Sequence, residues 1–131
     1  MSAKIYIATR SEQTLQVEIT VHVAAYSYPL QPVAYSYPLP HVIQNYPALE
    51  WGYPGIGSQN LALSILMDHL GEINDLVAVE RTEAYKLYEA FARDYIAKLP
   101  LPGFQLTDNQ IDDWIKCHRA LEAPHHAHAE R

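Results

Sequence analysis

The sequence predicts an α+β fold, in which a small antiparallel β-sheet packs against about three helices. Two observations lead to this class. Near the N-terminus, apolar and polar residues alternate with the period of two that a strand requires. Three later segments instead repeat their apolar residues at helical spacing. A length of 131 residues is about that of one ordinary domain. We therefore expect a single domain over residues 1–123, followed by a flexible, histidine-bearing tail over residues 124–131.

Residues 3–9 and 15–23 are the predicted N-terminal hairpin of the sheet. The second segment, LQVEITVHV, alternates strictly, which indicates one buried face and one solvated face. Residues 104–106 are a short segment that follows a proline-rich stop after the second predicted helix. We expect them to form a short edge strand that joins the hairpin.

Three helices are expected, over residues 58–70, 82–99 and 108–121. Ser58 is a good N-cap for the first, whose nearly uniform apolar sequence is typical of a buried central helix. Thr82 is the expected N-cap of the second. Thr107 and Gln110 have the spacing of a capping box at the start of the third.

The turn before the first helix, WGYPGIG, invites comparison with phosphate-binding loops, because helix N-termini attract anions. No Lys-Ser or Lys-Thr pair follows Gly57, and no βαβ unit precedes the turn, so neither the P-loop nor the dinucleotide fingerprint is met. We interpret this stretch as a scaffold that packs Trp51 and Tyr53 against the first helix.

Residues 25–47 contain a tandem repeat. The first copy, AYSYPLQPV (residues 25–33), and the second copy, AYSYPLPHV (residues 34–42), are identical at seven of nine positions. Because prolines disfavour helices and central strands, we predict an extended, polyproline-like surface loop. Its tyrosines either pack against the body or contact a partner. The tyrosines with this predicted partner-binding role are Tyr26, Tyr28, Tyr35 and Tyr37.

The net charge of −6 and the pI of about 5.5 argue against direct nucleic-acid binding and favour a protein partner with a basic surface. Most of the acidic residues fall in the helical half, where they either contact that partner or simply aid solubility. The acidic residues with a predicted partner-binding role are Glu72, Asp75, Glu80, Glu83, Asp108, Asp112 and Asp113. No apolar run approaches a membrane span and no signal peptide is recognised, so we expect a cytoplasmic protein.

No catalytic residue, cofactor or metal site is expected. Cys117 and His118 are adjacent on a helix and cannot face each other as a catalytic pair. The alternative is a small metal- or thiol-dependent enzyme that uses His69, Cys117 or the tail histidines. A second alternative is a structural homodimer.

The run of Trp51-Gly52-Tyr53, Gly55, Gly57 and LALSILMDHLG resembles a family of small uncharacterised domains that we associate with bacteria, phages and mobile elements. Further matching positions are Leu87, Tyr88, Phe91, the segment 96–100, the segment 104–107 and Ile111. The resemblance implies a phage or mobile-element setting and assigns no catalytic residue. By analogy with other small acidic proteins from such settings, we expect a non-enzymatic inhibitor of a host defence complex, similar to anti-CRISPR proteins.

Overall fold

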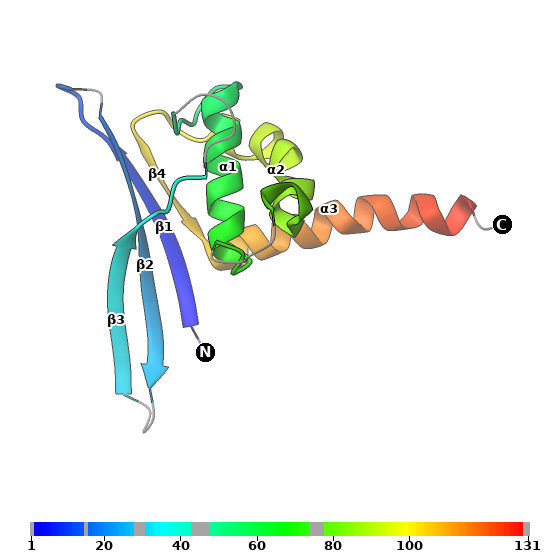
Figure 1. Cartoon of the computed structure of the whole chain (residues 1–131), viewed down its shortest axis with the longest axis horizontal. Helices are drawn as coiled ribbons and strands as arrows, with labels where there is room; N and C mark the ends of the chain where they lie inside the picture. The colour runs from blue at the N-terminus through cyan, green and yellow to red at the C-terminus, as the bar shows by residue number, and fades with distance from the viewer. Residues whose placement is uncertain (1, 15, 28–30, 43–47, 74–77, 130–131) are drawn as a thin grey trace.

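The computed structural model describes residues 2–14, 16–27, 31–42, 48–73 and 78–129; for residues 2, 25–27, 31–33 and 123–129 it describes the backbone only. Strands β1 (Ser2–Arg10), β2 (Val17–Ser27), β3 (Gln31–Pro38) and β4 (Gly103–Thr107) form one sheet in the order β3-β2-β1-β4. All three of its pairings are antiparallel. Figure 1 shows the helices together on one side of this sheet. The predicted α+β class, with its hairpin and short edge strand, is confirmed.

The face of the sheet that meets the helices is set by the alternation of the strands. Tyr6 pairs with Val21 and with Leu106, and all three side chains are fully buried. Ile19 and Val23 are buried on the same side of β2. The predicted burial of the apolar face of residues 15–23 is therefore confirmed for the residues described, because a period of two places alternate side chains on one face.

The predicted loop over residues 25–47 was wrong in its first part, since β2 runs to Ser27 and β3 covers Gln31–Pro38. The backbone N–H of Leu39 donates to the Ile19 carbonyl at 3.0 Å, so the odd-numbered positions of this ladder are the hydrogen-bonded ones. Pro32 and Pro38 pair with Tyr26 and Thr20 at the intervening positions. Their ring nitrogens therefore face the free edge, where a strand tolerates proline.

Helix α1 (Ile56–His69) lies against the sheet, and α2 (Glu83–Asp94) packs beside α1. The short 3-10 helices η1 (Val79–Arg81) and η2 (Ile96–Lys98) flank α2, so the predicted second helix ends at Asp94 rather than Leu99. Helix α3 (Asp108–Ala129) follows β4 directly and extends past the body of the domain (Figure 1). It therefore includes most of the segment that the sequence analysis set apart as a tail.

The expected helix caps are confirmed for α2 and α3 but not for α1. The Tyr85 N–H donates to the Thr82 hydroxyl at 3.1 Å. Thr107 and Gln110 exchange both bonds of a capping box, at 3.2 and 2.9 Å. Ser58 instead lies inside α1 and donates to the Tyr53 carbonyl, because α1 already begins at Ile56.

The glycine-rich turn before α1 was predicted to pack two aromatic residues, Trp51 and Tyr53, against the body of the domain, and it does so for Trp51. Trp51 is fully buried, donates its indole N–H to the Pro100 carbonyl at 2.8 Å and meets Phe104 edge-on at 5.3 Å. Gly52 has φ of 87° and lies so close to Leu101 that a Cβ would clash. Tyr53, which we expected to pack on α1, is 47% exposed.

Candidate functional site

A cluster of polar groups joins the C-terminal end of α1 to the sheet. Asp68, which is 8% exposed, accepts hydrogen bonds from the hydroxyls of Tyr6 at 2.6 Å and Tyr37 at 2.7 Å. The Lys4 ammonium pairs with the same carboxylate at 3.1 Å. The two tyrosines and the lysine come from β1 and β3, so a single carboxylate connects α1 to two strands that are not neighbours.

The protonation states in this cluster follow from burial and from Asp68. Burial, and then the hydrogen bond to Asp68, raises the pKa of the Tyr6 phenol far above its ordinary value. The pKa of Tyr37 is raised for the same two reasons, in that order, although the Lys4 ammonium partly offsets them. Burial alone would lower the pKa of Lys4, but hydrogen bonds to Tyr37 and Asp68 outweigh it and raise the pKa. At neutral pH both phenols are therefore donors and the lysine is a cation.

The cluster continues toward the first turns of α3. His69 Nε2 lies 2.6 Å from Asp112 Oδ1, and the Asp108 carboxylate accepts the backbone N–H of Lys4 at 3.0 Å. Each of these groups already has a partner within the chain. Their arrangement holds α1, α3 and β1 together, and it offers no unpaired nucleophile or base for acid–base chemistry at Asp68.

Two further residues that we predicted to bind a partner take intramolecular roles at the start of α2. Both carboxylate oxygens of Glu72 accept backbone N–H groups of the first turn, from Glu83 and Ala84, each at 2.9 Å. Glu72 thus satisfies helix N–H groups that have no partner within the helix. Glu83 pairs with Arg119 at 3.0 Å and with Lys86 at 3.6 Å.

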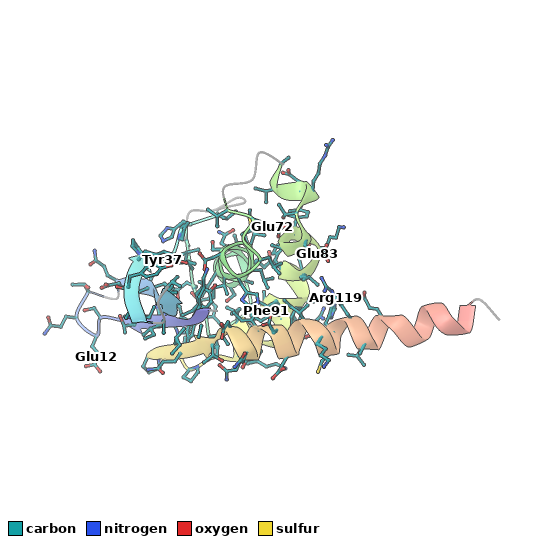
Figure 2. The ribbon with its side chains drawn as sticks, turned by 90° about the horizontal axis from the view of Figure 1, so that it is seen from below. Glu12, Tyr37, Glu72, Glu83, Phe91 and Arg119 are labelled. Atoms are coloured by element: carbon teal, nitrogen blue, oxygen red, sulfur yellow. The ribbon has the colours of Figure 1, made fainter. Side chains whose placement is uncertain are left out.

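The predicted partner-binding residues are therefore not gathered into one patch. Figure 2 shows Tyr37 on the sheet side of the molecule and Glu83 with Arg119 on the helix side. Glu80, Asp113 and Tyr35 are exposed. Tyr26 pairs with Pro32 through its backbone, while Tyr28 and Asp75 lie outside the described residues.

Sequence reasoning missed the role of Asp68, although one signal was present. It is the only charged residue between Gly57 and His69. The other polar residues of that segment are serines and the amides Gln59 and Asn60. A buried helix tolerates a carboxylate when hydrogen-bond donors meet it. Lys4 and Tyr6, on one face of the first strand, were the available donors.

The other face of the sheet carries no helix, and it is the largest feature that the sequence analysis did not identify. The strand register places on it the side chains of Ala3, Ile5, Ile7, Thr9, Glu18, Thr20, His22, Ala24, Ala34, Ser36, Gln105 and Thr107. Ile5 is 36% exposed although it lies in the middle of the sheet. A shallow groove of about 410 Å³ crosses β1, β2 and β3 here, and Ile5, His22 and Ala34 are among the residues that line it. We call this surface the open sheet face.

A second hollow, of about 360 Å³, lies between the start of α1 and the end of α2. Pro54, Gly55, Arg93 and Lys98 line it. The side chain of Arg93 is 72% exposed and pairs with Asp94. The two cations are thus surface groups rather than a built anion site.

Within the described residues, no group of three or more His, Cys, Asp or Glu side chains is placed to hold a metal ion. The side chains of the tail histidines lie outside that description. Over the same residues, no helix has both the length and the apolar character needed to cross a membrane.

A family model matches residues 31–117, which span β3, α1, α2, β4 and the first part of α3. The chain belongs to DUF6166, a family of unknown function. This confirms that the chain is an uncharacterised domain of a recognisable family. No curated protein and no solved structure matches the chain. The family match includes the whole second copy of the repeat but only the last three residues of the first.

Proposed function

We propose that the protein is a non-enzymatic interaction protein that binds through the open sheet face. The observation that supports this proposal is the near absence of charge on that face. The chain has 15 acidic and nine basic residues, yet Glu18, at the rim, is the only Asp, Glu, Lys or Arg among the described side chains on that face. Depletion of charged residues is the compositional mark of the core of a protein–protein interface.

The occupant that fits best is a second copy of the chain. Each copy carries a net charge of −6, so two copies repel each other wherever acidic residues would meet. The open sheet face is a surface on which they can meet without burying like charges. With strands about 4.8 Å apart and a rise of about 3.3 Å per residue, the face covers roughly 500 Å². A face-to-face pair would bury roughly 1,000 Å², the lower limit for a specific interface.

Sedimentation velocity over a range of concentrations tests this proposal. We expect a monomer–dimer equilibrium. Ile5→Lys should raise the dissociation constant of the dimer at least tenfold, because the lysine would place a charge in an interface that otherwise carries almost none. Gln13→Lys is the matched control, since it adds the same charge in the exposed turn between β1 and β2. A chain that is monomeric at every concentration, or a dimer that Ile5→Lys leaves unchanged, would contradict the proposal.

A second candidate surface is the outer side of the helices, which would remain exposed in such a dimer. Glu80 and Asp113 are exposed, and neither forms an ion pair within the described part of the chain. They are the predicted acidic contacts best placed to meet a basic protein, whereas Glu72, Glu83 and Asp112 have intramolecular partners. That the partner is a host defence complex met by a phage or mobile-element protein remains our prediction.

Charge reversal separates the two surfaces. Glu80→Lys with Asp113→Lys should abolish capture of the basic partner from a lysate of the natural host, and it should leave the monomer–dimer equilibrium unchanged. Capture that survives this double reversal would exclude the acidic surface.

A further inference from the structure

The two copies of the repeat occupy different places in the β2–β3 hairpin. The first copy (residues 25–33) contains the last three residues of β2 and the first three residues of β3. The second copy (residues 34–42) supplies the rest of β3 and the segment after it. One sequence thus serves on both sides of the same hairpin.

Strand β2 is held by its pairing with β1, which includes Ala25 of the first copy. On the β3 side, three described contacts fasten the hairpin to the body, and all three come from the second copy. Besides the Tyr37 hydrogen bond to Asp68, Leu39 is 2% exposed and its N–H donates to Ile19. The Val42 N–H donates to the Ser64 hydroxyl at 2.8 Å. The first copy has the same residue types at the equivalent positions, Tyr28, Leu30 and Val33, because its two differences fall elsewhere.

The register permits the first copy to take the place of the second. Val23 now pairs with Tyr35, and Val21 with Tyr37. With Tyr26 in the place of Tyr35, Val23 would pair with a residue three positions later in the chain. That is the spacing of a two-residue hairpin with Ala24 and Ala25 in the turn. The odd-numbered positions of β2 are hydrogen-bonded, so this closing pair would be hydrogen-bonded, as a tight turn requires.

We propose that the β2–β3 hairpin has two registers, a long one seen in the structure and a short one in which the first copy replaces the second. In the short register Tyr28 bonds Asp68, Leu30 fills the place of Leu39, and residues 34–42 move into the connection before α1. The inference rests on the register and the repeat alone, so it stands whether or not the open sheet face binds a partner.

The energetic balance favours the long register without excluding the short one. The short register loses the four outermost β2–β3 pairs, from Ala24↔Ala34 to Ser27↔Gln31, and the two β1–β2 pairs that Ala24 and Ala25 make with Ala3 and Ser2. Ala-Ala also lacks the residues with φ above zero that two-residue turns prefer. The longer connection adds little cost, because loop-closure entropy grows only slowly with loop length. The equivalent residues of the first copy can make all three fastening contacts, because they are of the same types.

Disulfide trapping in a Cys117→Ser background detects both registers. His22 pairs with Ser36 in the long register and would pair with Ser27 in the short one; both are non-hydrogen-bonded pairs, whose Cα separation suits a disulfide. Under mild oxidation, His22→Cys/Ser36→Cys should form its disulfide at once. His22→Cys/Ser27→Cys should form its disulfide slowly but completely, because oxidation traps the minor register. Failure of the second pair to oxidise in the folded protein would overturn the proposal.

Deletion of residues 34–42 tests whether the first copy can fasten the hairpin. The shortened chain should fold cooperatively, and Ala24→Asn with Ala25→Gly should raise its thermal midpoint by improving the turn. Tyr28→Phe should then lower that midpoint as much as Tyr37→Phe does in the full chain, while leaving the full chain unchanged. If the deletion variant stays unfolded even with the Asn-Gly turn, or ignores Tyr28→Phe, the inference is wrong.

Discussion

Asp68 shows how one residue can fix the relation between two layers. Its carboxylate is the common acceptor for Tyr6, Tyr37 and Lys4, and it is the acceptor for both phenol hydroxyls. Hydrogen bonds to a charged group are stronger than those between neutral groups. Because the carboxylate is buried, each hydrogen bond that it loses also leaves more of the cost of removing its charge from water uncompensated. The cluster therefore positions α1 on the sheet with a specificity that apolar packing alone would not provide.

Tyr6→Phe should lower the free energy of unfolding by about 1.5–3 kcal/mol near neutral pH, because it removes a buried bond to a carboxylate. Burial and the Asp68 bond raise the pKa of Tyr6 above the ordinary 10.0, so its contribution is complete below about pH 10. As pH rises further, the unfolded chain loses the phenol proton first and this contribution falls, by up to about 1.4 kcal/mol per pH unit. Urea unfolding should therefore show a smaller difference in the free energy of unfolding between wild type and Tyr6→Phe at about pH 11 than at about pH 8.

Tyr35→Phe is the control for this series. Tyr35 stacks on Tyr37 at 6.3 Å but is 55% exposed. Its loss of a hydroxyl should change stability by less than about 0.5 kcal/mol at either pH. A gap between wild type and Tyr6→Phe that is constant with pH would mean that Tyr6 is not held protonated in the folded state.

At the scale of elements, the sequence predicted what local pattern controls and missed what distant partners control. Alternation identified β1 and β2, helical spacing identified α1 and α2, and the capping box located the start of α3. The strand β3 was missed because its two prolines disfavour a strand unless both face a free edge, and the edge exists only once the sheet is assembled. Thr82 was correctly predicted to cap α2, but the additional capping role of Glu72 was missed because Glu72 is distant along the chain from the N–H groups it accepts.

Glu72→Ala should destabilise the domain by about 1–2 kcal/mol, because two N–H groups of the first turn of α2 lose their acceptor and the helix dipole loses a compensating charge. Chemical denaturation measures the loss, and amide hydrogen exchange at Glu83 and Ala84 should accelerate locally. Glu80→Ala, which removes an exposed carboxylate from η1, is the matched control and should be neutral within about 0.5 kcal/mol. Equal effects of the two substitutions would rule out the capping role.

At the scale of the whole molecule, the candidate binding surface could not be derived from the sequence, although strand alternation had already grouped Ile5 with Ile7 on one face. The outward direction of Ile5 and Ile7 follows only from knowing that the helices cover the face of Tyr6 and Ala8. Period-two alternation assigns residues to two faces but does not say which face is covered when both carry apolar side chains. The intramolecular partners of Glu83 and Asp112 could not be foreseen for a related reason, since Arg119 and His69 come from distant elements.

The boundary of the folded unit is a property of the whole molecule and can be tested directly. Helix α3 packs on the body through Ile111, Trp114 and Ile115, with Trp114 lying 4.9 Å from Phe91. The last described ion pair from α3 to the body is that of Arg119 with Glu83 on α2, and the last within the helix is that of His118 with Glu122. Leu121 is 80% exposed, where the helix extends past the body. The stabilising contacts described for α3 thus lie in its N-terminal part.

A chain that ends after Glu122 should therefore keep its thermal midpoint within a few degrees of the full chain, about what a loss below 1 kcal/mol allows. A chain that ends after Asp113 loses Trp114 and Ile115 and should not fold, because removing two large core side chains costs several kcal/mol each. Circular dichroism melting of both variants measures this. If the longer variant also unfolds, residues 123–131 belong to the folded unit, and the domain boundary near residue 123 that composition suggests would have to move to the end of α3.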